Sequence, residues 1–186
     1  MRYGVDFSEL DVYVGRDGAL VVTHDAVTDP VAERALPTLS DIFDMVHGKM
    51  GIYVELKGDR TGRALGDLLS SGATRDMRLI AGSAVLDLVG ELRQYVPDVP
   101  RSILFTADWL GRTEAMIDAC LDLGATYAHP CFRPIEQPLI DACHQSGLHV
   151  MTPHTNDPQE ARRFAALGVD VIASDDPRIL LPLRDC

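Results

Sequence analysis

Short apolar segments alternate with amphipathic segments along the whole chain of 186 residues. The apolar segments are rich in Val, Ile and Leu, as in strands of a parallel sheet that is covered on both faces. Because Arg16-Asp17-Gly18 is a hairpin signal, we expect the segment after it to extend the first strand, which leaves seven main strands. The predicted strands are Val5–Val14, Ala19–Val22, Ile52–Leu56, Met77–Ala81, Arg101–Phe105, Thr126–His129, His149–Thr152 and Val169–Ala173.

Apolar residues between these strands recur at the spacing of amphipathic helices. Thr38 and Asp41 follow Pro37 as in a capping box, and Asp157 precedes Pro158 as an N-cap precedes the first helical position. Glycine follows most of the predicted helices, since glycine adopts the left-handed conformation at low cost. Five of the predicted helices are identified by apolar residues that begin at Leu39, Ala64, Val85, Met116 and Leu139, and the sixth opens at Asp157 as its N-cap. The terminal glycines are Gly72, Gly124, Gly147 and Gly168.

Repeated strand–helix units predict an α/β fold with a parallel sheet, either open or closed as a barrel. No glycine-rich phosphate loop follows any predicted strand, which disfavours the open sheets that bind nucleotides. Polar residues also gather at the C-terminal ends of many strands, at the rim where barrel enzymes place their sites. We therefore expect one domain over residues 1–186, a TIM-type (β/α) barrel. The polar residues are Asp11, Glu55, Ser83, His129, His154 and Asp175.

The predicted barrel is incomplete. Barrels of this class typically take about 250 residues, and Met1-Arg2-Tyr3-Gly4 runs directly into the first strand. We therefore expect the first βα unit to be missing. Seven strands leave an unpaired sheet edge, so we expect either self-association as a homo-oligomer or a distorted closed barrel.

Composition narrows the range of partners. The net charge of −11 argues against a nucleic-acid partner, which requires a basic face. The sequence has no apolar run that could span a membrane and no signal peptide, so we expect a cytoplasmic protein without stable membrane insertion. The four cysteines lack metal-type spacing, and Cys120 and Cys143 fall on apolar helix positions, where buried free thiols are expected.

The most informative side chains lie towards the ends of the first two main strands. Strand alternation places the side chains of Glu9 and Asp11 on the same face, and Glu55 ends the next main strand, two residues before Lys57. Acids that share a buried face are costly unless they are neutralised. A divalent cation is the usual partner, and ligands that are all oxygen favour a hard one.

Five segments together resemble the glycerophosphodiester phosphodiesterase family. They include the motif Glu9-Leu-Asp11 and the dipeptide His24-Asp25, and the likeness is collinear over nearly the whole chain. The five segments are residues 4–12, 17–25, 36–39, 53–57 and 168–177.

The resemblance implies a metal-dependent hydrolase that cleaves a glycerophosphodiester to glycerol 3-phosphate and an alcohol, a reaction of lipid metabolism. It implies that Glu9, Asp11 and Glu55 ligate Mg²⁺ or Ca²⁺. It also implies that His24 is one of two acid/base histidines and that Lys57 lies near the phosphate. The substrate would be a small soluble phosphodiester, since the acidic chain lacks a basic patch for a membrane surface.

The sequence departs from the family in ways that leave an alternative open. It has no match to the His-Arg-Gly strand that supplies the other catalytic histidine, and Pro153-His154-Thr155-Asn156 stands where the family has Trp-Thr-x-Asn. A truncated or catalytically impaired relative, which binds a phosphorylated metabolite or a cation without turnover, is therefore the alternative. We hypothesise that His129 or His154 partly replaces the missing histidine. Trp109 either lines the substrate pocket or packs against the rim.

Overall fold

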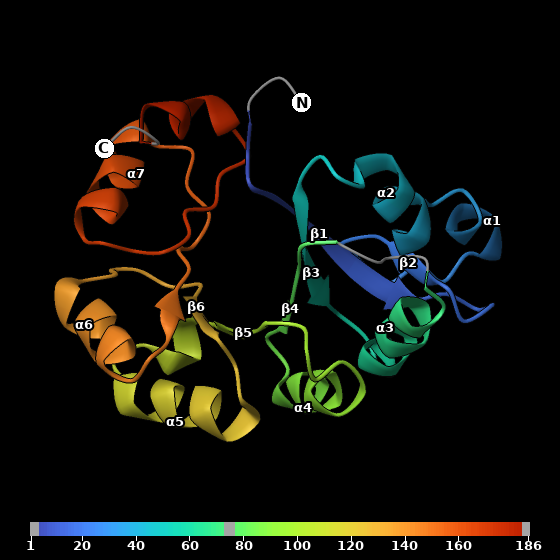
Figure 1. The fold of residues 1–186 in the computed structure, drawn as a ribbon, viewed down its shortest axis with the longest axis horizontal. Coiled ribbons are helices and arrows are strands. Elements are labelled where there is room, and N and C mark those ends of the chain that lie inside the picture. The colour runs from blue at the N-terminus through green and yellow to red at the C-terminus, as the bar shows by residue number, and fades with distance from the viewer. Residues whose placement is uncertain (1–3, 73–76, 184–186) are drawn as a thin grey trace. The chain divides into compact units, whose positions relative to one another are not determined.

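The computed structural model describes residues 4–72 and 77–183 (Figure 1). These residues form two compact units. The N-terminal unit is Val5–Arg101 without residues 73–76, and the C-terminal unit is residues 102–183 together with Gly4. Residues 1–3, which the sequence places directly before the first strand, lie outside the described part, as does Cys186.

The N-terminal unit contains four strands in the spatial order β2-β1-β3-β4. Strand β2 runs antiparallel to β1, so the predicted hairpin extension is confirmed, and β1, β3 and β4 are parallel. The register of β1 on β3 places Asp11 opposite Glu55. The strands are β1 (Phe7–Val14), β2 (Leu20–Val22), β3 (Gly51–Leu56) and β4 (Leu79–Ser83).

Four helices accompany these strands: α1 (Pro30–Glu33), α2 (Leu39–Val46), α3 (Thr61–Ser70) and α4 (Leu86–Tyr95). The predicted capping box of α2 is present, because Thr38 and Asp41 bond each other's backbone N–H groups. Helix α1 was not predicted. It is a single turn that begins after Asp29, whose side chain accepts a hydrogen bond from Val31 N. The apolar core of the unit includes Val12, Leu39, Phe43, Ile52, Val54, Leu56, Leu65, Leu88 and Leu92.

The C-terminal unit continues the same alternation, with parallel strands in the order β5-β6-β7. Its fully buried side chains include Phe105, Met116, Ile140 and Phe164. The strands are β5 (Arg101–Phe105), β6 (Tyr127–Pro130) and β7 (His149–Val150), and the helices are α5 (Thr113–Leu123), α6 (Gln137–Gln145) and α7 (Pro158–Ala166). Three short 3₁₀ helices, η1 (Ala107–Trp109), η2 (Pro177–Ile179) and η3 (Leu181–Leu183), were not predicted.

The strand predicted at Val169–Ala173 is wrong as a continuous strand. It is reduced to a single bridge between Val171 and Met151. The reason is a local crowding of donors, because Asp170 N and Val171 N both donate to Val150 O, at 3.0 and 3.2 Å. Two residues opposite one partner form a bulge, which interrupts the ladder.

Other expectations about the elements are confirmed. The glycines predicted to end helices, Gly72, Gly124, Gly147 and Gly168, all have positive φ. Cys120 and Cys143 are buried free thiols, and burial raises their thiol pKa values to about 12 and about 11. Within residues 4–72 and 77–183, none of the helices has the length and apolarity needed to cross a membrane.

Candidate functional site

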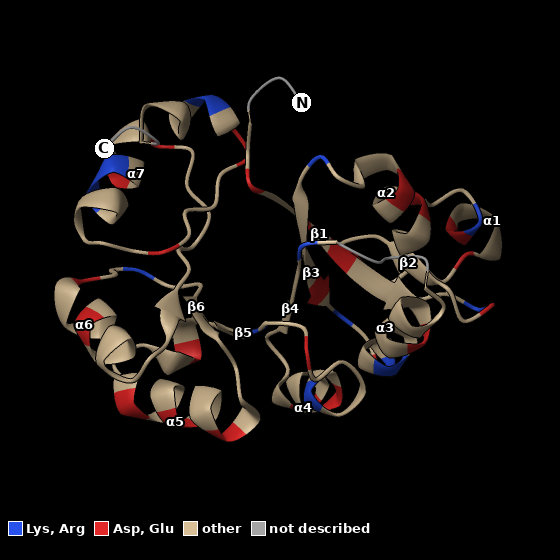
Figure 2. Cartoon of the chain, viewed as in Figure 1, with Lys and Arg blue, Asp and Glu red and all other residues tan. Residues whose placement is uncertain are grey.

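Three carboxylates of the N-terminal unit form a compact cluster. Each of Glu9, Asp11 and Glu55 offers an oxygen, and these oxygens all lie within 4.8 Å of one another. The cause is simple: Asp11 and Glu55 are paired across the parallel strands β1 and β3, and Glu9 precedes Asp11 by one strand repeat on the same face. Figure 2 shows acidic residues on both strands.

The cluster perturbs its own acids. Burial raises the pKa of Glu9 to about 7, and the neighbouring charges of Asp11 and Glu55 add to the effect. Burial also raises the pKa of Glu55, against the opposing influence of Lys57. The negative charge of the three acids is therefore not fully compensated by nearby positive charge. Acids with pKa values raised in this way are common at binding and catalytic sites.

Lys57 supplies the positive charge nearest to the cluster. Its Nζ atom lies 2.5 Å from Glu55 Oε1 and 3.2 Å from Asp11 Oδ1. The backbone continues the β1–β3 ladder to this point, since Lys57 N donates to Val12 O at 3.1 Å. Burial opposes a charged ammonium here, but the contacts with Glu55 and Asp11 outweigh it and raise the pKa of Lys57.

The carboxylates fit a hard divalent cation. All three donors are oxygens, they lie close enough to share one ion, and their charges exceed the single charge of Lys57. Mg²⁺ and Ca²⁺ prefer such ligands. The predicted ligand set is therefore brought together by the fold.

His24 lies close to this cluster, directly after β2. The preceding residue, Thr23, donates its backbone N–H to Asp11 O at 3.0 Å, which ties the segment to β1 beside the cluster. Burial dominates the raised pKa values of Glu9 and Glu55, and the nearby His24 side chain acts weakly against that rise.

Asp25 is the hydrogen-bond partner of His24. No role was predicted for this residue from the sequence. Its Oδ1 atom lies 2.9 Å from His24 Nδ1, and both side chains are exposed. If Nδ1 carries the proton donated to Asp25, Nε2 is left with a lone pair directed elsewhere. The sequence does contain a signal for this pairing, because the two residues are adjacent in His24-Asp25.

His129, a second predicted site residue, lies in the C-terminal unit at the end of β6. Its Nε2 atom is 3.0 Å from Thr152 O. Burial lowers the pKa of His129 to about 4, so the ring is neutral at pH 7. The ring is thus better suited to packing and to a neutral hydrogen bond than to serving as a cationic acid.

His154 follows β7 and is part of a polar network in the same unit. His154 Nε2 lies 2.6 Å from Asp175 Oδ2, and Asn156 Nδ2 donates to the same oxygen at 3.2 Å. Arg133 holds the segment in place, because it donates to His154 O at 2.8 Å and pairs with Glu160. Asp175 therefore links the last loop to the segment after β7. The role of Arg133 was not predicted, because its partners are distant in sequence.

Trp109 packs against its own strand end. Its ring lies 4.9 Å from the ring of Phe105 in an edge-on arrangement, and the Arg112 guanidinium lies 4.8 Å from the Trp109 ring centre. These contacts are those expected if Trp109 packs against the rim. A role of Trp109 in lining the substrate pocket stays a prediction.

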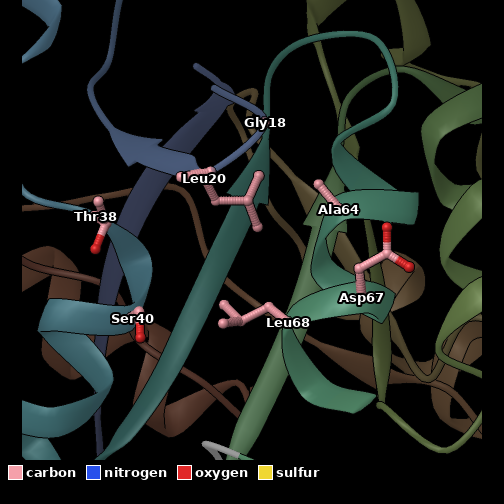
Figure 3. A pocket seen from close by; sticks show the side chains of 8 residues that line it. Gly18, Leu20, Thr38, Ser40, Ala64, Asp67 and Leu68 are labelled. Carbon is pink, nitrogen blue, oxygen red and sulfur yellow. The ribbon is translucent and has the colours of Figure 1, made fainter. Parts of the chain in front are cut away.

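A pocket of about 230 Å³ lies elsewhere in the N-terminal unit, between the β1–β2 turn, α2 and α3 (Figure 3). Leu20 and Leu68 lie on opposite sides of it. None of the clustered acids lines this pocket. It is therefore separate from the candidate site.

No family model matches the sequence. Comparison with individual proteins, by contrast, finds relatives of one kind. The glycerophosphodiester phosphodiesterase of Caldanaerobacter subterraneus is 23% identical over 223 residues, covering 98% of this chain and 87% of that protein. YhdW of Bacillus subtilis is 21% identical over 217 residues, covering 97% of this chain and 87% of that protein. The chain is related to the glycerophosphodiester phosphodiesterases.

Solved structures of such phosphodiesterases have the same fold. A phosphodiesterase of Oleispira antarctica, in complex with its product sn-glycerol-3-phosphate, has a TM-score of 0.86 at 20% identity and covers 100% of this chain and 87% of that chain. A glycerophosphodiester phosphodiesterase of Agrobacterium tumefaciens has a TM-score of 0.74 at 23% identity, with 97% and 88% covered. The predicted relationship and the TIM-type α/β class are confirmed. The predicted enzyme class, a phosphoric diester hydrolase, agrees with the names of these relatives.

Proposed function

We propose that this protein hydrolyses a glycerophosphodiester to glycerol 3-phosphate and an alcohol, with a divalent cation, Mg²⁺ or Ca²⁺, as cofactor. The observation that carries the proposal is the cluster of Glu9, Asp11 and Glu55 with Lys57 beside it. The relationship to phosphodiesterases supports it, and so does the product sn-glycerol-3-phosphate in the Oleispira relative.

Each residue has a role that its chemistry permits. Glu9, Asp11 and Glu55 would hold the cation, which when bound polarises a phosphoryl oxygen. Lys57 would bind the phosphate as a compact positive charge. His24 would exchange a proton with an alcohol oxygen through Nε2, while Asp25 fixes the ring through Nδ1.

The substrate would be a small soluble diester, in a cytoplasmic setting. The net charge of −11 makes an anionic membrane surface an unfavourable partner, so free glycerophosphocholine is a suitable test compound. In Figure 2, helices α3, α4 and α7 carry both basic and acidic residues, whereas α2, α5 and α6 carry acidic residues without Lys or Arg.

The test is hydrolysis of glycerophosphocholine with Mg²⁺, with Ca²⁺ or with a chelator. We expect turnover that requires the metal and that is lost in Asp11→Asn. Asp44→Asn on the exposed face of α2 is the matched control and should retain activity. Metal-independent turnover would refute the ligand assignment. Metal binding by a folded protein without turnover would favour the alternative, a relative that binds a cation or a phosphorylated metabolite.

A further inference from the structure

Lys57 lies among the carboxylates and is not directed away from them. Its ammonium contacts Glu55 Oε1 at 2.5 Å and Asp11 Oδ1 at 3.2 Å, and its side chain is only 25% exposed. Two of the three groups assigned to the cation therefore already have a positive partner within the chain.

A divalent cation and this ammonium would compete for the same space. Both are attracted to Asp11 and Glu55, and like charges that share partly buried carboxylates repel one another strongly. Three carboxylates are also matched more closely by two positive charges than by one. Lys57 stands just beyond the end of β3, on a flexible stem of four carbons, so its ammonium can move without moving the strand.

We propose that Lys57 is a built-in counter-ion that the divalent cation displaces, and that the displaced ammonium then binds the phosphate group of the substrate. The inference rests on the metal site of the proposed function. It makes Lys57 a link between two binding events: the cation releases the charge that the phosphate then uses. Binding of metal and binding of phosphate are then coupled, and the coupling is reciprocal.

The sequence offers an unusually clean probe, because Lys49 and Lys57 are its only lysines. Lys49 is exposed after α2, where its Nζ donates to Met45 O at 2.7 Å. Reductive methylation with ¹³C labels both side chains and keeps their charge. The variants Lys49→Met and Lys57→Met assign the two resonances.

Titration of the labelled wild-type protein with Mg²⁺ alone should move the Lys57 resonance and leave the Lys49 resonance in place. Inorganic phosphate added at saturating Mg²⁺ should then move the Lys57 resonance again. This measurement does not depend on the folding of any variant. A Lys57 resonance that stays in place at saturating Mg²⁺ would overturn the inference.

Calorimetry gives the second readout. If Lys57 competes with the metal, Lys57→Met should bind Mg²⁺ at least about fivefold more tightly than wild type, a typical size for coupling between sites. Lys49→Met should bind it as wild type does. Equal or weaker binding by folded Lys57→Met would overturn the inference and leave the metal site intact. Absence of saturable binding in wild type and both variants would instead overturn the proposed function, and the inference with it.

Discussion

Single residues on β1 and β3 show how an excess of negative charge favours the binding of a cation. Glu9, Asp11 and Glu55 are held together by strand pairing, and only Lys57 is in direct ionic contact with members of the cluster among the described residues. The pKa of Glu9, raised to about 7, is the consequence of that arrangement. Perturbed pKa values of this kind cluster at functional sites, and a bound cation would relieve the repulsion.

Part of this cluster could be predicted from the chain alone. Alternation along a strand places Glu9 and Asp11 on one face, whatever the rest of the fold does. The pairing of Asp11 with Glu55 could not be derived in the same way, because it depends on the register between strands that are far apart in sequence. The resemblance to a family predicted that Glu55 joins Glu9 and Asp11. The local sequence pattern could not predict it.

The histidine beside the cluster gives the first residue-level prediction. His24→Asn should lower phosphodiesterase turnover by about 10²–10⁴-fold, the usual contribution of a general acid or base. Affinity for Mg²⁺ and thermal stability should change little, since the His24–Asp25 pair is exposed.

His47→Asn, at the exposed end of α2, is the matched control for His24→Asn and should keep full activity. Steady-state kinetics and calorimetry test both variants. A His24→Asn enzyme with normal turnover would contradict the assigned role.

His129 gives a prediction about acid stability. Its pKa is lowered to about 4 in the folded state, below the 6.5 of an unperturbed histidine, so the unfolded chain binds more protons between these values. Its stabilising contribution is therefore complete above pH 6.5 and is lost as the pH falls towards 4, by about 1.4 kcal/mol per pK unit of difference.

Replacing His129 by Gln keeps a donor for Thr152 O but removes the titration. The free energy of unfolding of His129→Gln, measured with denaturant, should fall less than that of wild type between pH 6.5 and pH 4. Parallel pH profiles for the two proteins would show that His129 is not buried as a neutral ring.

At the scale of elements, most helices and strands follow from periodicity and from their end signals. The capping box of α2 and the glycines after four helices are local features, and the structure retains them. Elements that depend on non-local contacts were predicted less well. The strand at Val169–Ala173 fails because two donors converge on Val150 O, an event that no apolar pattern reveals.

The contact between α3 and α4 depends on small residues. A Cβ atom at Gly62 would lie 2.5 Å from Glu91 Cβ, and one at Gly66 would lie 3.0 Å from the backbone oxygen of Tyr95. Glu91 also compensates for the absence of a side-chain cap on α3, because its Oε2 accepts from Gly62 N at 3.1 Å. The two helices therefore approach each other closely at the glycines of α3, and a side chain of α4 caps the start of α3.

This contact gives a paired prediction. Gly62→Ala should lower the free energy of unfolding by about 1–3 kcal/mol, the usual cost of overpacking. Gly90→Ala, within α4, has no atom within 4 Å of the new Cβ and should raise it by about 0.5–1 kcal/mol, because alanine favours the helix. Urea unfolding measures both. Equal effects of the two variants would refute the close packing of α3 on α4.

At the scale of the whole molecule, a cation bound by the native state alone must stabilise it. The ligands come from two strands that are paired only when the N-terminal unit is folded, so the unfolded chain has no comparable site. At a Mg²⁺ concentration 100 times the dissociation constant, the stabilisation is about 2.7 kcal/mol. For a chain of this length, this corresponds to a rise of roughly 5–10 °C in the unfolding midpoint.

Thermal unfolding followed by circular dichroism, with Mg²⁺ and then with excess chelator, tests this expectation. The rise should disappear with the chelator and in Asp11→Asn, which removes one charged ligand from the cluster. It should persist in Asp44→Asn, which removes an equal charge from the exposed face of α2. A rise that persists in Asp11→Asn would mean that the cation binds elsewhere. If the rise in the unfolding midpoint is lost equally in both variants, net charge and not the cluster governs the effect. A general ionic effect does not distinguish two carboxylates that differ only in position.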